Sequence, residues 1–182
     1  MGSDNPSGAE NQQETKGCFL NSMWVAGLVD GEGCFSVSIH RNPHVRRTRG
    51  WQITAVFQVS QHERYRQVLE CLVDVFGCGR VRSKGPNSSV DVYSVTSLEQ
   101  LERNVIPFFE RHRLVVKGPD FERFATIVRS MRRKEHLDPE GFERIVRLAY
   151  EMNAGGKQRS RTLEEVLEGS SETVRQAPHQ RR

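Results

Sequence analysis

The sequence lacks any apolar run near the 18 residues that a membrane-spanning helix needs, and its first residues contain no signal-peptide-like apolar stretch. Its four cysteines (Cys18, Cys34, Cys71 and Cys78) form no Cys-x₂-Cys pair and have no His-x₃₋₅-His nearby, which argues against structural zinc. Reduced thiols are the default for such cysteines. We therefore expect a soluble, cytoplasmic protein with no membrane partner.

Lysine is also scarce, with 5 residues against 22 arginines in a chain of 182 residues. The formal net charge is only +4, so charge alone makes a nucleic-acid partner plausible without settling it. The planar guanidinium of arginine suits phosphates and guanine edges. A GC-rich coding sequence explains the arginines equally well, and it would indicate a bacterial host rather than an organelle.

The length fits one domain with tails. Residues 1–16 are polar and rich in Gly, Ser, Asn and Gln, a composition typical of a disordered tail. Residues 17–153 carry the periodic apolar patterns and form the expected core domain. Residues 154–182 are a basic C-terminal extension, expected to be partly disordered apart from a short amphipathic stretch at 163–167.

Apolar periodicity predicts an α+β fold. A helix over residues 18–30 ends near Gly31 to Gly33, and strands over 34–40 and 52–59 follow it. A helix over 62–76 ends at Gly77, and two shorter strands over 79–84 and 90–96 come next. Helices are then expected at 97–110, 119–133 and 138–152. The order is αββαββα with additional C-terminal helices, and a curved antiparallel sheet is the expected centre.

The segment from Val25 to Gly33, VAGLVDGEG, is the most informative in the chain. Its small residues allow two helices to approach closely, and the acidic residue beyond the helix end is then presented where two subunits meet. We expect Trp24, Ala26 and Gly27 to form this dimer interface. The segment thus couples a contact between subunits to an acid.

The same nine residues resemble the LAGLIDADG motif in type at every position. The order of elements over residues 18–110 also matches that family, as do the local segments 57–61, 76–79 and 108–112. The chain therefore resembles the single-motif LAGLIDADG homing endonucleases over residues 18–168. The resemblance implies the family fold, with the sheet as a DNA-binding saddle.

The resemblance also implies an active site. Glu32 matches the acidic metal-binding position, and Gly31 matches the residue whose carbonyl helps to hold the metal. Gln61 matches a glutamine that orients water near the scissile phosphate, and Lys117 matches a basic residue that stabilises charge there. The implied metal is Mg²⁺ or Mn²⁺, with Ca²⁺ supporting binding without cleavage, and no small-molecule cofactor is expected.

Two points near this site differ from a simple match. Asp30 lies on the helical part of the motif, so we expect it to organise the helix end rather than to bind metal. Some relatives carry a further basic residue after the glutamine, where this chain has Tyr65 between Arg64 and Arg66. Which arginine, if either, completes the pocket stays open at this point.

Strand alternation predicts a polar, outward face on the sheet. Its residues mix types that suit guanine, adenine and phosphate. The expected DNA-binding residues are Ser36, Ser38, His40, Asn42, Gln52, Thr54, Gln58, Arg80, Arg82, Lys84, Asp91 and Tyr93, with Arg46, Arg47 and Arg49 in the hairpin tip on flanking phosphates. Any half-exposed sheet carries polar residues outward. However, residues 34–97 hold nine Arg and Lys against four acids, which favours DNA.

The resemblance implies that the chain is a homodimeric, site-specific DNA endonuclease that takes part in intron homing. It would hydrolyse both strands of a long pseudo-palindromic target and leave short 3′ overhangs. Because the motif occurs once and the site needs two copies, a symmetric dimer is expected. The alternatives are a non-cleaving RNA maturase or DNA-binding regulator on the same fold, and a structural α+β domain that binds no nucleic acid.

Overall fold

A computed structural model describes residues 20–44, 50–153 and 161–171 of the chain. The first half comprises α1 (Ser22–Glu32), β1 (Gly33–Arg41), β2 (Trp51–His62), the 3₁₀ turn η1 (Glu63–Tyr65), α2 (Arg66–Phe76), β3 (Arg80–Ser83) and β4 (Val90–Val95). The second half comprises α3 (Leu98–Gln100), the π-helical turn η2 (Leu101–Val105), α4 (Ile106–Arg111), α5 (Gly118–Arg132), the 3₁₀ turn η3 (Glu135–Leu137), α6 (Pro139–Glu151) and α7 (Leu163–Ser171). The predicted α+β order is confirmed.

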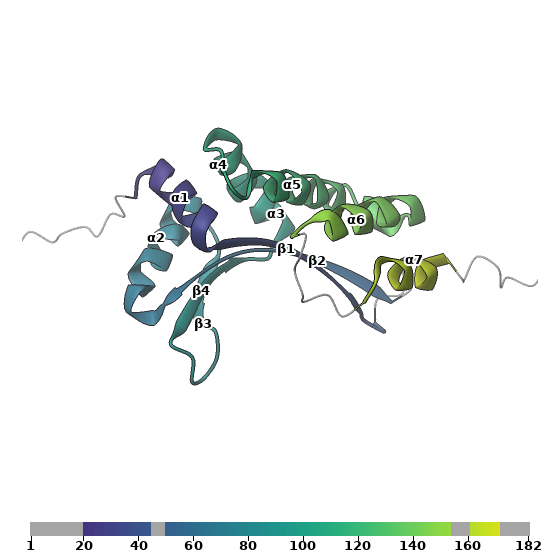
Figure 1. Ribbon diagram of the computed structural model, residues 1–182, viewed down its shortest axis with the longest axis horizontal. Coiled ribbons are helices and arrows are strands. Elements are labelled where there is room, and N and C mark those ends of the chain that lie inside the picture. The colour runs from purple at the N-terminus through teal and green to yellow at the C-terminus, as the bar shows by residue number, and fades with distance from the viewer. Residues whose placement is uncertain (1–19, 45–49, 154–160, 172–182) are drawn as a thin grey trace, which may run out of the picture.

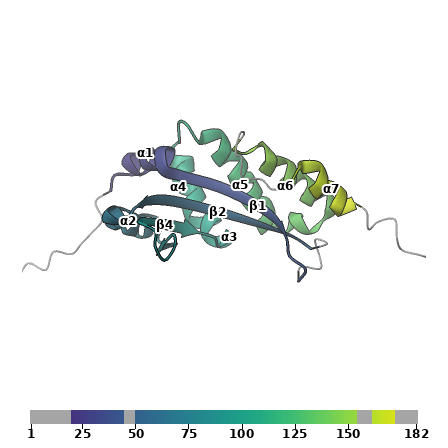
Figure 2. The same cartoon turned by 60° about the horizontal axis from the view of Figure 1, so that its bottom comes forward.

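The four strands form one antiparallel sheet in the order β1-β2-β4-β3. The helices gather on one side of this sheet, and the β3–β4 hairpin projects away from them (Figure 1). Figure 2 shows β1 and β2 running side by side along the length of the molecule, with α5 and α6 behind them. No helix in the described part of the chain covers the other face of the sheet, the open face.

Aromatic side chains fill the space between the sheet and the helices. Phe35 of β1 stacks on Phe57 of β2, with ring centroids 5.1 Å apart. Phe109 of α4 meets both rings edge-on. Such offset and edge contacts add to the free energy of burial. This aromatic cluster fixes the covered side of β1 and β2, so the alternate residues of both strands face outward.

Tyr93 of β4 shows how tightly this core is packed. Its hydroxyl donates a hydrogen bond of 2.9 Å to the carbonyl of Cys78, and burial raises the pKa of its phenol. Gly79 lies directly against the ring, because a Cβ there would come within 2.6 Å of it. Gly79 also has a φ of +85°, which a side chain would disfavour. The turn before β3 therefore requires glycine at this position.

Several helix ends differ by a few residues from the sequence prediction. α1 starts at Ser22 rather than at residue 18, because the Asn21 side chain accepts from the Met23 N–H at 2.8 Å and caps the helix there. α2 starts at Arg66 rather than at residue 62, because β2 continues to His62 and η1 follows. The predicted ends at Gly77, a left-handed C-cap, and at Asp138, an N-cap, are confirmed.

The far end of the sheet is joined to the C-terminal helices. The guanidinium of Arg41 lies 4.2 Å from the Trp51 ring centroid, and that of Arg161 lies 5.5 Å from it. Arg161 precedes α7, the helix that the amphipathic stretch at 163–167 predicted in part. On the edge strand β1, the carbonyl of Phe35 accepts a hydrogen bond of 3.2 Å from the Asn153 side chain, just after α6.

Among the helices described, none is both long and apolar enough to cross a membrane.

Candidate active site and nucleic-acid interface

The C-terminal end of α1 meets the loop between α4 and α5. The Asp30 carboxylate accepts three backbone N–H groups from this loop, those of Val115 at 2.6 Å, Val116 at 3.1 Å and Lys117 at 3.0 Å. A carboxylate that accepts several backbone N–H groups is a strong tie between two segments. Asp30 therefore fixes the backbone of residues 115–117. This agrees with the expectation that Asp30 organises the helix end rather than binding metal.

The same loop returns a contact to the helix end. The ammonium of Lys117 donates to the carbonyl of Asp30 and, at 3.1 Å, to the carbonyl of Gly31. The last carbonyls of a helix have no partner within the helix and carry partial negative charge, so a cation is stabilised there. The structure thus brings together two of the predicted site residues, Gly31 and Lys117.

Glu32 is the last residue of α1 and is exposed. The next residue, Gly33, makes the tight turn into β1, because a Cβ there would lie 2.6 Å from Val29 Cγ1 and 2.7 Å from the Val29 carbonyl oxygen. This close approach fixes the backbone at the junction between helix and sheet, where Glu32 lies. The glycine that ends the motif is therefore a steric requirement.

The oxygen atoms at this junction fit a divalent ion, since Mg²⁺ prefers carboxylate and carbonyl oxygens. Glu32 supplies the carboxylate and Gly31 the carbonyl. Within the described part of the chain, no group of three His, Cys, Asp or Glu is close enough to hold a metal ion.

Gln61 lies at the same end of the sheet. It is half-buried on β2, two residues beyond Val59, and Val59 pairs with Gly33 at the start of β1. On its other side, Gln61 pairs with Asp91 of β4. The fold therefore places Gln61 on the strand next to the helix–sheet junction that carries Glu32.

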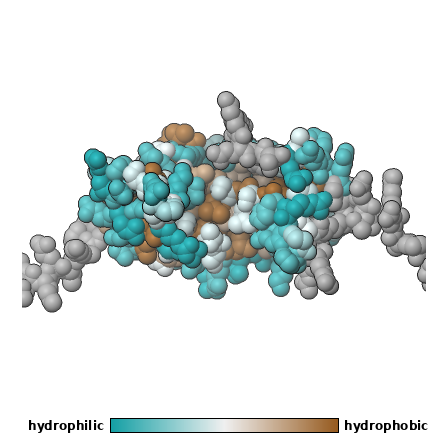
Figure 3. Space-filling view, turned by 90° about the horizontal axis from the view of Figure 1, so that it is seen from below, coloured by the Kyte–Doolittle hydropathy of each residue, from teal (hydrophilic) through white to brown (hydrophobic). Residues whose placement is uncertain are grey.

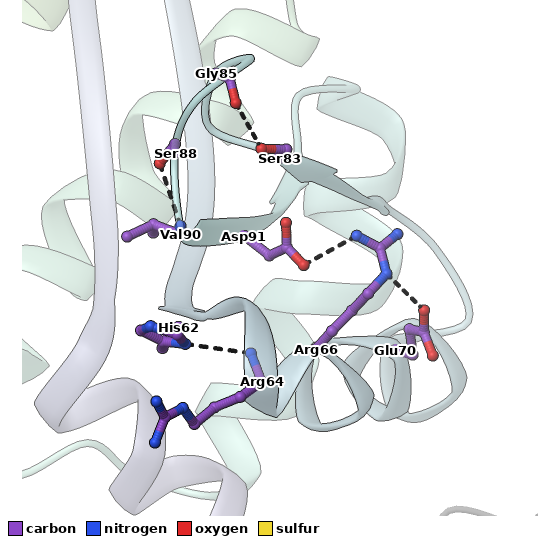
Figure 4. Close-up of polar contacts among 9 residues, drawn as sticks. All are labelled: His62, Arg64, Arg66, Glu70, Ser83, Gly85, Ser88, Val90 and Asp91. Carbon is purple, nitrogen blue, oxygen red and sulfur yellow. Dashed lines mark hydrogen bonds and ion pairs between the residues drawn. The ribbon is translucent and has the colours of Figure 1, made fainter.

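The two arginines beside Tyr65 differ in their surroundings (Figure 4). Arg66 donates to Asp91 at 3.0 Å and to Glu70 at 2.9 Å, and these hydrogen bonds raise the pKa of its guanidinium. The Arg64 side chain extends in the opposite direction from that of Arg66, while its backbone N–H donates to His62 Nδ1 at 3.2 Å. Arg66 is therefore committed to a structural ion pair, and Arg64 is the better candidate for the pocket.

The open face of the sheet carries most of the residues expected to read DNA. In β1 and β2, Ser36, Ser38, His40, Gln52, Thr54 and Gln58 alternate with buried apolar residues, as predicted. Asn42, beyond β1, donates to Gln52 at 2.6 Å. Figure 3 shows this side of the molecule, where hydrophilic residues surround a partly hydrophobic centre.

The β3 arginines lie on the same face. Arg80 pairs with Ser94 and Arg82 pairs with Val92, and both partners lie on the uncovered side of β4. Arg80, Arg82 and the following Lys84 are exposed. Arg46, Arg47 and Arg49 of the hairpin tip lie outside the described residues.

The outward orientation expected for Asp91 and Tyr93 is wrong. They are 4% and 0% exposed, on the helix-covered side of β4. Both polar groups have partners inside the fold, Arg66 for Asp91 and the Cys78 carbonyl for Tyr93. The outward residues of β4 are instead Val90, Val92 and Ser94, which the sequence analysis missed; the pairing of Tyr93 with buried Val59 fixes this register.

The expected interface residues of α1 also divide between two sides of the helix. Ala26 is 3% exposed and packs in the core with Val25 and Val29, so its accessibility was predicted wrongly. Trp24 is 47% exposed, and a Cβ at Gly27 would meet nothing within 4 Å. The accessible side of α1 therefore contains Trp24 and Gly27 but not Ala26.

An αββαββα fold with a carboxylate at the end of its first helix and an arginine-bearing open sheet defines a class of DNA-binding nucleases. Residues 25–128 match the family described as LAGLIDADG endonuclease. The chain is 34% identical over 155 residues to homing endonuclease I-ApeII of Aeropyrum pernix, covering 82% of this chain and 89% of that protein. It is 33% identical over 133 residues to a probable intron-encoded endonuclease 3 of Neurospora crassa, covering 72% of this chain but only 25% of that protein.

Solved structures agree with these sequence matches. The homing endonuclease I-TnaI superimposes with a TM-score of 0.71 at 39% identity, covering 82% of this chain and 97% of that one. I-LtrWI, described as a LAGLIDADG homing endonuclease bound to target DNA, gives a TM-score of 0.69 at 34% identity, covering 74% of this chain and 45% of that one. The chain belongs to the LAGLIDADG homing endonuclease family.

Proposed function

We propose that two copies of the chain form a homodimer that hydrolyses both strands of a long, pseudo-palindromic double-stranded DNA target. The reaction requires Mg²⁺ or Mn²⁺ and leaves short 3′ overhangs. The observation that carries this proposal is the contact between Lys117 Nζ and the Gly31 carbonyl, beside the exposed Glu32. This contact supports a site in which the Lys117 ammonium and the Glu32 carboxylate act at the same helix end.

Each residue of the site has a distinct role in this proposal. Glu32 and the Gly31 carbonyl would hold the metal, which would supply activation of water and compensation of charge at the phosphate. Gln61 orients water from the neighbouring strand. Lys117 stabilises negative charge on the phosphate, and Arg64 adds a second positive charge because Arg66 is already engaged by Asp91 and Glu70.

The homodimer is supported by the accessible side of α1 and by the relatives. Gly27 leaves open space where another helix can approach, and the exposed Trp24 beside it offers apolar surface. The chain also covers only 45% of I-LtrWI, so it matches one part of a longer nuclease chain. Two copies of this chain would supply two such parts.

DNA as the substrate is supported by the open sheet face. Arg80, Arg82 and Lys84 are exposed there beside amide and hydroxyl side chains, a mixture suited to base edges and phosphates. I-LtrWI and I-SmaMI are both described as bound to DNA, the latter to cleaved DNA in one structure. We therefore propose duplex DNA, lying on the open face, as the partner.

The test uses a DNA duplex that carries the uninterrupted insertion site of the chain's own gene. With Mg²⁺ the wild-type protein should cut both strands, and with Ca²⁺ it should bind without cutting. Glu32→Gln should bind this duplex in Ca²⁺ as the wild type does and should not cut it in Mg²⁺. Tight binding by the wild type without cleavage would instead support the regulator, and cleavage by Glu32→Gln would remove the assigned metal site.

The dimer has its own test. Gly27→Leu adds a side chain whose Cβ would have no described atom of its own subunit within 4 Å, so the fold of the monomer should be unchanged. Sedimentation should nevertheless show a shift from dimer to monomer, because the added bulk separates the two helices. Gly27→Leu that sediments as an undisturbed dimer would mean that the subunits meet elsewhere.

A further inference from the structure

Two adjacent valines in the loop between α4 and α5 are unusually exposed. Val115 is 88% and Val116 is 74% exposed, the largest values among the exposed large hydrophobic residues described. A single exposed apolar residue is ordinary, but adjacent ones in a contiguous patch mark a surface that another molecule covers. Because Asp30 holds their backbone N–H groups, these side chains cannot turn inward without breaking that tie.

These valines adjoin the accessible side of α1. Met23, Gly27 and Asp30 are three and four residues apart and therefore share one side of that helix. Met23 is 64% exposed, and the space over Gly27 is open. Since the Asp30 carboxylate binds the valine backbone directly, the loop that carries the two valines adjoins this side of α1.

On the other side of the loop, Val115 lines a groove of about 650 Å³ between α4 and α5. Its lining combines the buried side chains of Phe109, Leu114 and Phe121 with the charged residues Glu110, Arg113, Glu122 and Arg129. The groove is therefore mixed in character, and the exposed apolar surface of the loop consists of the two valines.

Of the partners considered, a second copy of the chain fits this surface best. DNA is bound mainly through its phosphates and through hydrogen bonds to base edges, and valine side chains can make neither of these contacts. A two-fold interface brings the same patch of each copy to its partner, so surface next to the helix contact is brought near the other copy as well. The choice of a second copy as the partner rests on the homodimer of the proposed function.

We propose that Val115 and Val116 form a second contact with the other copy, continuous with the α1 contact, and that this contact holds the loop that carries Lys117. The same three residues, 115–117, are bound through their backbone to Asp30, and Lys117 reaches the Gly31 carbonyl at 3.1 Å. Association of the two copies thereby steadies the basic residue of each active site.

The test is the double variant Val115→Thr/Val116→Thr. Threonine keeps the shape and the β-branching of valine, and the two side chains are exposed, so the thermal unfolding of the isolated chain should not change. Sedimentation without DNA or metal should show self-association weakened about tenfold or more, since each valine loses the benefit of apolar burial. The matched control is Val56→Thr/Val92→Thr, the same change on the open sheet face, which should self-associate like the wild type.

The cleavage rate tests the second half of the proposal. At protein concentrations where the loop variant is fully dimeric, its single-turnover rate should remain below the wild-type rate, because the weakened contact no longer holds the loop that carries Lys117. A wild-type rate in the fully dimeric loop variant would overturn this half of the inference. Unchanged self-association of the loop variant, or equal weakening in the control, would overturn the inference. A wild-type chain that is monomeric or inactive would contradict the proposed function itself, so the two failures are distinguishable.

Discussion

Two hydrogen bonds join Asp30 and Lys117. The Asp30 carboxylate accepts one from the Lys117 backbone N–H, and the backbone carbonyl of Asp30 accepts the other from the Lys117 ammonium. The acid therefore sets the backbone from which the lysine extends, while the lysine satisfies a carbonyl at the end of α1. Neither residue can move far without releasing the other.

Asp30→Asn should test this mutual hold. Asparagine keeps the size of the side chain but loses the charge that strengthens the three loop hydrogen bonds, so the free energy of unfolding should fall by about 1 to 2 kcal/mol. The single-turnover cleavage rate should fall, while DNA binding in Ca²⁺ is retained. The matched change Glu122→Gln on α5 should alter neither quantity, and a wild-type rate in Asp30→Asn would show that the loop is held by other contacts.

Gly33→Ala should destabilise the junction between α1 and β1. The new Cβ would lie 2.6 Å from Val29 Cγ1 and 2.7 Å from a backbone oxygen that cannot rotate away. Strain of this kind costs about 1 to 3 kcal/mol. Urea unfolding should show that loss for Gly33→Ala but not for Gly31→Ala, whose Cβ would meet nothing within 4 Å. Equal stability of the two variants would contradict the close packing at Gly33.

Alkaline pH should weaken the fold through Tyr93. Burial raises the pKa of its phenol, so the folded chain keeps the proton at a pH where the unfolded chain, with a tyrosine pKa near about 10, releases it. The stability contribution is complete below about pH 10 and decreases as the pH rises above it. Burial also raises the pKa of the Cys78 thiol, which acts in the same direction.

Urea unfolding at about pH 8 and about pH 10.5 measures this effect. Tyr93→Phe should lose about 0.5 to 1.5 kcal/mol at the lower pH, with its hydrogen bond to Cys78, and should show a smaller decrease at the higher pH. Tyr65→Phe, at a residue 51% exposed, should behave like the wild type. The prediction is wrong if Tyr93→Phe and the wild type lose equal stability between the two pH values.

Arg82→Ala should change base preference rather than overall affinity. Arg82 is exposed on the open face and pairs across with Val92, so in the proposed complex it faces the groove. Losing a guanine contact costs about 1 to 3 kcal/mol and relaxes preference at one symmetric pair of positions. A binding profile over all single-base variants of the target would show this, and Arg147→Ala, on α6 with its partner Glu143, should leave the profile unchanged. Uniform weakening across the profile would make Arg82 a phosphate contact instead.

The sequence predicted the element order and the faces of β1 and β2 because apolar and polar residues alternate there without interruption. In β4 the same reasoning reversed the faces of Asp91 and Tyr93. Their partners, the Arg66 side chain and the Cys78 carbonyl, come from other elements, and no local pattern reveals a buried polar group satisfied at a distance.

The proposed site rests on the resemblance of the sequence to the family rather than on any local pattern of apolar and polar residues. Gly31, Glu32 and Lys117 were identified by resemblance, and the structure brings Gly31 and Lys117 into contact. Ala26 was misjudged because two adjacent small residues look alike in sequence, although a helix turns them to different sides. The exposure of Val115 and Val116 has no sequence signal, since it depends on how Asp30 holds a loop 85 residues away.

The two edges of the sheet bear on how copies of the chain can assemble. β1 is one edge, and the carbonyl of Phe35 is already taken by Asn153; β3 is the other, only 4 residues long and bearing Arg80 and Arg82. Covered, short and charged edges discourage the addition of a further strand. In the proposed dimer each copy thus keeps a separate sheet, so each half of a DNA site is read by a complete surface, and the chain is protected from open-ended stacking through its strands.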